Sequence, residues 1–171
     1  MRTIALVPIG PVPASVLAHL QRELPATVKR DVIIGKEIAI PSTALDTTRR
    51  QYLGSALLDE LARHDVAGAD RVVGSIDADA YAPGLNFIFG QAQKPGRFAI
   101  VALPRLRDSF RGQPENEERF LSRVLKETTH EIGHTLGFAH CPDRTCVMFF
   151  SNSFGDTDQK TARFCARHTI D

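Results

Sequence analysis

The 171-residue sequence has no long apolar run, no low-complexity tract and no excess of either charge, and each absence excludes a class of protein. No apolar stretch approaches the roughly 20 residues of a membrane span. The net charge of +1 gives no electrostatic reason to expect a nucleic acid or an anionic membrane as partner. With 43% hydrophobic and 24% charged residues, the composition is that of one globular domain with a substantial core.

Cysteine is also scarce, and the three cysteines of the chain cannot all pair in disulfides. The N-terminal segment from Met1 to Gly10 is short and interrupted by Pro8, which argues against an export signal and for a buried first strand. We therefore expect a cytoplasmic protein, in which reduced thiols are available to bind metal.

The most informative segment is an eleven-residue run near the C-terminus, HEIGHTLGFAH, which has the pattern HExxHxxGxxH. In a helix, positions i and i+4 project from one face, so His130 and His134 can reach a single metal ion, with Glu131 beside them to hold a water. Gly137 allows a left-handed turn that brings His140 back toward the other two imidazoles. Three nitrogens that leave the fourth position of zinc open are typical of a catalytic site. The alternative is an ordinary helix that carries polar residues.

A second cluster of metal-binding residues follows directly. Cys141 and Cys146 bracket a four-residue loop, and Cys165 and His168 lie three apart on a predicted helix. Two short-spaced pairs separated by a longer segment are the layout of a closed, structural zinc site. The alternatives are a disulfide, or three buried thiols with His168 at the surface. Because Cys141 is next to His140, a closed site here would fix the loop that aims His140.

These residues resemble the metzincin metallopeptidases, and more closely the archaemetzincins. The resemblance rests on the HExxHxxGxxH run, on a cysteine directly after its third histidine with another five residues on, and on Met148 at the position of the methionine turn. It implies a metzincin-like α/β (α+β) fold with a twisted mixed sheet, an edge strand, an active-site helix and a small C-terminal subdomain. The single domain, residues 1–171, would divide into an upper subdomain, 1–137, with the zinc helix, and a lower subdomain, 138–171, with the second zinc site.

The resemblance also implies roles for the residues of the first cluster. His130, His134 and His140 would bind a catalytic zinc, and Glu131 would act as general base. The chain departs from some metzincins at Phe150, where those proteins have a tyrosine that assists the transition state.

For the second cluster, the resemblance implies a structural zinc, giving two zinc ions per chain. Its ligands would be Cys141, Cys146 and Cys165. The family pattern usually ends in a CxxC pair, whereas this chain has His168 in place of the last cysteine. An imidazole is an established zinc ligand, although water or another side chain could take its place. Met148 would pack beneath the catalytic site, which is also what an ordinary buried methionine does.

The function predicted from these residues is a zinc-dependent peptidase that acts on a peptide or protein, with neither nucleic acid nor membrane as partner. The rival interpretation is a catalytically weak or inactive zinc-binding module that binds a peptide or protein. Phe150 leaves room for the rival, and the intact Glu131 argues against it, since a binding module has no need of that carboxylate.

The rest of the chain predicts strands and helices by its apolar periodicity. We expect strands at 3–8, 28–34 (extended or paired by 37–40), 70–75, 85–89 and 98–103. We expect helices at 12–24, from 46 or 47 through 61, from 115 or 116 through the zinc run, and from 156 or 157 past Cys165 and His168.

Three loops carry further predictions. By the resemblance, residues 86–91 form an edge strand that pairs with an extended substrate, and the alternative is an interior hairpin. Residues 149–154 would line the pocket for the residue after the scissile bond. Asp77 and Asp79 are expected in a solvated turn rather than a calcium site, because the loop lacks the required glycine and glutamate.

Overall fold

The computed structural model describes residues 2–64 and 66–170, and its centre is a five-stranded sheet. Its strand order is β2-β1-β5-β8-β7, with bounds β1 Thr3–Ile9, β2 Asp31–Ile34, β5 Arg71–Ile76, β7 Gly90–Ala92 and β8 Phe98–Ala102. The first four strands of this order run parallel, and β7 alone is antiparallel, to β8. The sheet is therefore mixed, as predicted, and β7 forms one of its edges.

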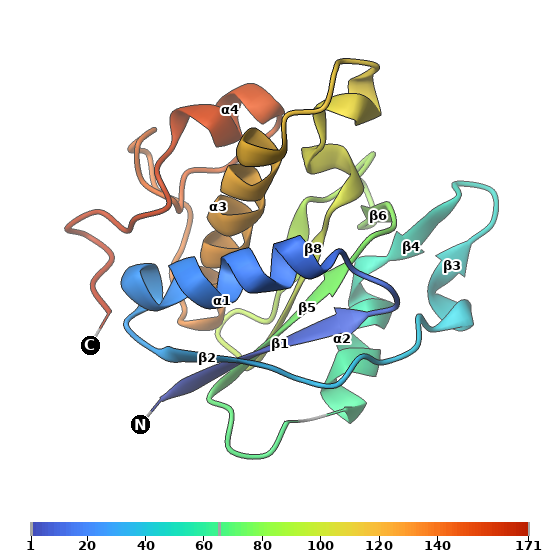
Figure 1. Ribbon diagram of the computed structural model, residues 1–171, viewed down its shortest axis with the longest axis horizontal. Helices are drawn as coiled ribbons and strands as arrows, with labels where there is room; N and C mark the ends of the chain where they lie inside the picture. Colours follow the sequence, from blue (N-terminus) through green and yellow to red (C-terminus); the bar gives the residue numbers. More distant parts are fainter. Residues whose placement is uncertain (1, 65, 171) are drawn as a thin grey trace.

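Helices cover both faces of this sheet, which gives the α/β architecture. Helices α1 (Ala14–Val28) and α3 (Glu117–Thr135) share one hydrophobic core with the sheet, and α2 (Gly54–Arg63) lies in a second core on the other side (Figure 1). The interior strand β1 is buried along nearly its whole length, which explains its continuous apolar sequence. Helix α3 packs against both α1 and the sheet. These two contacts fix the position of the zinc run.

Residues 42–53 differ from the prediction of a helix that begins at Asp46 or Thr47. They form a short 3-10 helix, Ser42–Ala44, and the strands β3 (Leu45–Asp46) and β4 (Gln51–Leu53), which join β6 (Ala80–Tyr81) in a small second sheet. The Asp46 carboxylate accepts hydrogen bonds from the backbone N–H groups of Thr48 and Arg49, both at 3.0 Å. Asp46 thus closes a turn, and α2 starts only at Gly54.

Three other boundaries differ as well. Helix α1 continues to Val28, so the second strand begins at Asp31 rather than at residue 28. The predicted strand 85–89 was wrong: apart from a single bridge between Ala80 and Ile88, pairing in this region starts at Gly90. The last helix, α4 (Phe154–Gln159), ends before Cys165 and His168, which lie in an irregular segment.

The loop between β8 and α3 contains two 3-10 turns, Pro104–Leu106 and Asp108–Arg111, and supplies partners for the acidic loop. Arg107 forms two hydrogen bonds to Asp77, and Arg105 forms two to Asp79. The sequence predicted that these acidic side chains would be solvated. In the structure they are ion-paired with the two arginines. No helix in the described part of the chain has the length and apolarity to cross a membrane.

Candidate active site and metal centres

Helix α3 carries the first cluster in its last two turns. The helix starts close to the predicted residue 115 or 116: Asn116 caps it, and its side chain accepts a hydrogen bond from the Arg119 N–H at 2.9 Å. His130 and His134 lie one turn apart on the helix. Gly137 follows the helix with φ of +93°, a conformation that only glycine adopts without strain. The chain then turns back and brings His140 to the other two imidazoles, as the sequence predicted.

Backbone carbonyl groups orient two of the three imidazoles. The ring Nδ1 of His130 bonds the carbonyl oxygen of Val147 at 2.7 Å, and that of His134 bonds the carbonyl oxygen of Phe138 at 2.8 Å. A carbonyl only accepts, so each Nδ1 carries the proton and each Nε2 keeps its lone pair for a metal.

The spacing of these nitrogens fits zinc. One ligand nitrogen from each of the three histidines lies within 4.8 Å of the others, and the Nε2 atoms of His134 and His140 are 3.2 Å apart. Zn–N bonds of roughly 2.0–2.1 Å place two nitrogens of a tetrahedral site about 3.3 Å apart. The spacing of these nitrogens is therefore compatible with a zinc ion held by the three histidines.

The charge states of the cluster suit a cation. Burial lowers the pKa of His130 well below its usual value, and it lowers the pKa of His134 to about 4 and that of His140 to a lesser degree. All three rings are neutral at pH 7 and therefore able to bind metal. Burial also raises the pKa of the Glu131 carboxyl well above its usual range; Glu127 raises it further, and Lys160 opposes both.

An open cleft of about 500 Å³ gives access to this cluster. One side consists of residues 85–92, which include the edge strand β7, and the other consists of Phe150, Ser151 and Asn152 after the methionine turn. His130 and Glu131 are buried at the bottom of the cleft, whereas His140 is exposed. Phe150 is 45% exposed, with its ring centroid 4.9 Å from that of His140. The predicted segments 86–91 and 149–154 thus both contribute to the cleft, although only Gly90–Ala92 is a strand and only residues 150–152 of the second segment line it.

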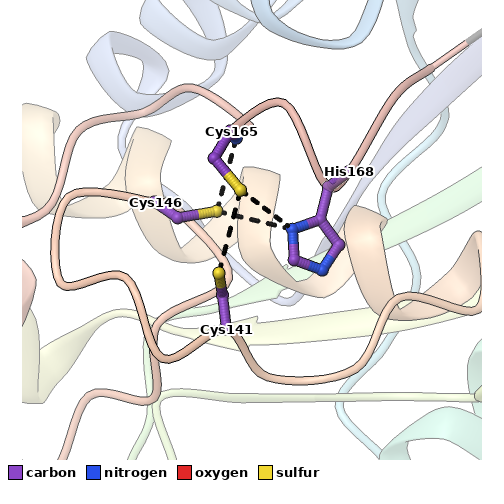
Figure 2. Close-up of side chains that lie close together, drawn as sticks. All are labelled: Cys141, Cys146, Cys165 and His168. Atoms are coloured by element: carbon purple, nitrogen blue, oxygen red, sulfur yellow. Dashed lines mark hydrogen bonds between the residues drawn. The ribbon is translucent and has the colours of Figure 1, made fainter.

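The second cluster is equally compact. Cys141, Cys146, Cys165 and His168 point toward one centre, with one ligand atom from each within 4.8 Å of the others (Figure 2). The sulfurs of Cys141 and Cys165 are 3.8 Å apart, and the Nδ1 of His168 is 3.7 Å from the Cys146 sulfur and 3.4 Å from the Cys165 sulfur. Zn–S bonds of roughly 2.3 Å place tetrahedral sulfurs about 3.8 Å apart. This geometry fits zinc.

The alternatives for these cysteines fit less well. All three thiols are free, and 3.8 Å is far from the roughly 2 Å of a disulfide. A backbone hydrogen bond from Arg167 lowers the pKa of Cys165 to about 7, whereas burial raises that of Cys146 to about 11. His168 does not lie apart at the surface, because its ring contacts Phe138 at a centroid distance of 5.0 Å.

Met148 connects the two clusters by packing. It is fully buried, and its sulfur lies against Gly133, inside the HExxH run, so closely that no Cβ would fit there. The backbone carbonyl of Met148 accepts a hydrogen bond from the Cys141 N–H at 3.0 Å. The methionine is therefore a support beneath the histidines, as predicted, and not a metal ligand.

Sequence reasoning missed three residues of the cleft. Glu127 lines it one helical turn before Glu131, and this i, i+4 spacing of carboxylates was a visible signal. Gly90 lies against Glu131, and Lys94 lines the cleft from the turn after β7. Neither residue stands in a local pattern that points to the zinc run.

The comparisons with known proteins agree with this geometry. The family model described as Peptidase family M54 matches residues 15–170. An archaemetzincin from Methanopyrus kandleri is 50% identical over 134 residues, which are 78% of this chain and 73% of that protein.

Solved structures extend the likeness to the fold. The crystal structure of the Methanopyrus kandleri archaemetzincin matches with a TM-score of 0.85 and 42% identity over 97% of this chain and 90% of that one. A zinc-dependent peptidase from Methanocorpusculum labreanum matches with a TM-score of 0.87 and 26% identity over 96% of each chain. The chain therefore belongs to peptidase family M54, the archaemetzincin family of zinc-dependent peptidases.

Proposed function

We propose that this chain hydrolyses peptide bonds with His130, His134 and His140 as ligands of a catalytic zinc and Glu131 as the general base. The observation that carries the proposal is the convergence of three neutral imidazoles at the bottom of an open cleft with a buried carboxylate beside them. A structural site would be closed by a fourth protein ligand. The described residues offer a set of three here, with the exposed His140 on the open side.

Each residue then has a separate task. Zinc held by the three imidazoles supplies a Lewis acid that polarises the scissile carbonyl and acidifies water. Glu131 accepts the proton of the attacking water and later delivers it to the leaving amine. The carbonyl oxygens of Val147 and Phe138 hold two of the rings in the productive tautomer. Phe150 offers no hydroxyl to the transition state.

The edge strand suits a peptide substrate. Within the five-stranded sheet, β7 pairs with β8 alone, so its other side offers backbone donors and acceptors to an extended chain along the cleft. This arrangement supports the metzincin mode of binding and makes a peptide or protein the substrate. The cleft would lie between an upper subdomain, 1–137, and a lower one, 138–171, of a single domain.

The second cluster is the proposed structural zinc site, which gives two ions per chain. Three thiolates with one imidazole form a closed tetrahedral set that leaves no position for water. Cys141 directly follows His140, so this ion would hold the loop that aims the third catalytic ligand. Reduced thiols are required, and this supports a cytoplasmic location.

A matched set of variants tests the catalytic assignment. Glu131→Gln should keep both zinc equivalents and lose hydrolysis of a broad peptide library, whereas His134→Ala should lose one equivalent and retain the second site. Activity of the parent should vanish with a chelator and return with added zinc. Turnover retained by Glu131→Gln would remove Glu131 from its role. Metal bound in the parent without any cleavage would instead favour the binding module, which the family membership does not support.

A further inference from the structure

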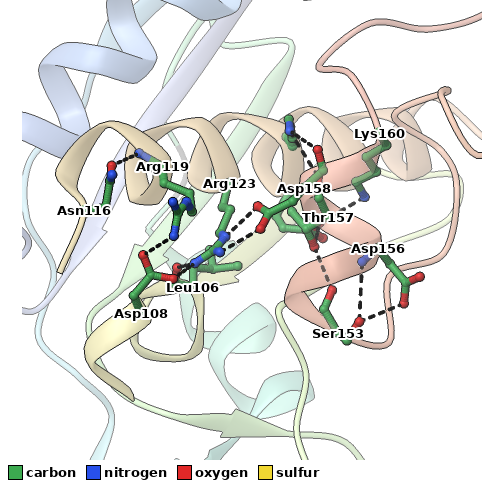
Figure 3. Close-up of polar contacts among 12 residues, drawn as sticks. Leu106, Asp108, Asn116, Arg119, Arg123, Ser153, Asp156, Thr157, Asp158 and Lys160 are labelled. Carbon is green, nitrogen blue, oxygen red and sulfur yellow. Dashed lines mark hydrogen bonds and ion pairs between the residues drawn. The ribbon is translucent and has the colours of Figure 1, made fainter. Parts of the chain in front are cut away.

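A buried ion pair joins α3 to the segment after α4 directly beside the cleft. The Lys160 Nζ is 2.9 Å from the Glu127 Oε1, and the two side chains are 0% and 4% exposed. Thr157 donates its hydroxyl to the same carboxylate oxygen at 3.1 Å, and Lys160 donates to the Phe149 carbonyl oxygen at 3.3 Å. Figure 3 labels the two side chains that α4 and its C-terminal end contribute to this contact, Thr157 and Lys160.

Only one partner of the pair faces the substrate. Glu127 lines the cleft, and Lys160 does not. The desolvation of two charges costs free energy that apolar side chains of similar size would not require. An ion pair therefore stabilises the contact between these elements less than apolar side chains would. It does, however, place the carboxylate of Glu127 at the cleft while Lys160 neutralises the charge of that carboxylate.

A second polar group in the same wall lacks a partner. The Oγ of Ser151 is buried and makes no hydrogen bond within the described residues, and Ser151 lines the cleft. Buried hydroxyls in folded proteins almost always have a partner. A ligand in the cleft would provide one. Ser151 belongs to the segment after the methionine turn, which was predicted to line the pocket for the residue after the scissile bond.

We propose that Glu127 and Ser151 make this pocket selective for an uncharged side chain that donates hydrogen bonds, with the amides of glutamine and asparagine preferred. An acidic side chain finds no free counter-charge in this pocket, because Lys160 is already paired with Glu127. A lysine or arginine gains no net attraction, because Lys160 already neutralises Glu127. An aliphatic side chain leaves the Oγ of Ser151 without a partner and offers no hydrogen bond to Glu127, which costs affinity. This specificity rests on the proposed function, since it concerns the substrate of the same site.

Removal of the positive charge of Lys160 tests the proposed selectivity of the pocket. Lys160→Met should leave the carboxylate of Glu127 uncompensated beside the cleft, so the preferred residue after the scissile bond should change from glutamine to lysine or arginine. Lys126→Met is the matched control. It is the same replacement at the same α3/α4 boundary, where Lys126 donates to the carbonyl oxygens of Thr157 and Asp158. Lys126 does not line the cleft.

The experiment uses the zinc-loaded full chain and four peptides that differ only after the scissile bond, with glutamine, lysine, glutamate or leucine. The same four side chains on peptide hydroxamates give dissociation constants without turnover. We expect the parent to favour glutamine over leucine by about tenfold. Lys160→Met should reverse the order of glutamine and lysine, and Lys126→Met should keep the order of the parent.

Each other outcome is decisive. A parent that prefers leucine, or a Lys160→Met variant that weakens all four ligands equally, overturns the proposal and leaves the ion pair a structural role. If the parent binds the hydroxamates in the expected order but cleaves nothing, the proposed function fails and the specificity stands. If Lys160→Met does not fold, Glu127→Gln carries the test: it should bind the glutamate ligand several-fold better relative to glutamine, and an unchanged ratio overturns the proposal.

Discussion

Gly90 of the edge strand lies directly against the side chain of Glu131. A Cβ atom at residue 90 would fall 2.6 Å from the Cγ of Glu131 and 2.7 Å from its Oε1, closer than real Cβ contacts. Glu131 is buried, so it has little room to withdraw. The strand that would receive the substrate and the carboxylate that would receive the proton are thus in contact, and the absence of a side chain at Gly90 fixes their separation.

Gly90→Ala should therefore displace the Glu131 carboxylate and lower kcat by about a hundredfold, the usual effect of a misplacement near 1 Å. The measurement is kcat and KM on one peptide, together with zinc per chain, which should remain that of the parent. Gly155→Ala is the control, because its Cβ would meet only the Ser153 Oγ at an ordinary 3.6 Å. Full activity of Gly90→Ala would show that Glu131 does not need its present position.

Met148 should act through packing rather than through the metal. Its replacement by alanine leaves a cavity under Gly133 and should lower the free energy of unfolding by about 2–5 kcal/mol. Leucine nearly conserves the volume, so Met148→Leu should cost less than about 1.5 kcal/mol. Urea unfolding of the zinc-loaded protein measures both. A Met148→Leu variant that folds normally but loses catalytic zinc would give the sulfur a role that its burial does not predict.

The zinc run could be predicted because its geometry is local. Helical spacing sets His130 against His134, and the left-handed turn at Gly137 returns His140, so eleven consecutive residues contain the whole construction. The methionine turn was equally readable, since Met148 follows Cys146 by two residues. The convergence of Cys141, Cys146, Cys165 and His168 was predicted, but their secondary structure was not, because a spacing of three fits a turn as well as a helix.

What the sequence could not predict depends on partners far along the chain. Asp46 is as good a residue for a turn as for a helix start, and only pairing of Gln51–Leu53 with Ala80–Tyr81 decides between them. Asp77 and Asp79 read as a solvated loop because their arginine partners come from another loop. The pair of Glu127 and Lys160 joins two elements whose sequences give no sign of each other.

His168 should be a ligand of the second ion. His168→Ala should lower the affinity for one zinc equivalent and the melting temperature together, because metal binding at such a site is coupled to folding. His64→Ala is the control, since His64 is exposed and its ring lies 2.9 Å from the carboxylate of Glu60 in α2. Metal content per chain after dialysis against a graded chelator measures the effect. An unchanged melting temperature and two retained ions would assign the fourth position to another group.

Asp70 should contribute stability that depends on pH. Burial raises its pKa, but the hydrogen bond from Arg30 at 3.0 Å and the charges of Arg71 and Arg2 outweigh burial, so the pKa is lowered. A carboxyl with a lowered pKa stabilises the fold above its unfolded pKa near 4, and this contribution is lost as pH falls through the folded pKa. Asp70→Asn should therefore be less stable than the parent at pH 7, and the two unfolding curves should converge at low pH. A difference in the free energy of unfolding that stays constant with pH would contradict this prediction. Loss of zinc at acid pH affects the parent and the variant alike, so it does not alter the comparison.

Arg123 should make the largest electrostatic contribution to the contacts that join α3 to α4 and to the loop before α3. Its guanidinium forms two hydrogen bonds to Asp158, at 2.7 and 2.8 Å, and donates to Asp108 at 2.9 Å and to the Leu106 carbonyl oxygen at 2.9 Å (Figure 3). The arginine and Asp108 side chains are only 3% and 7% exposed.

Arg123→Met should therefore lower the free energy of unfolding by about 3 kcal/mol, since it leaves a buried carboxylate with fewer partners. The loss should be at the lower end of the range for buried pairs, because Arg119 still reaches Asp108 at 3.1 Å and Asp158 is partly hydrated. Arg63→Met breaks the exposed pair with Glu60 and should cost less than about 1 kcal/mol. Urea unfolding of both zinc-loaded variants measures the difference, and equal losses would show that Arg123 contributes no more than a surface charge does.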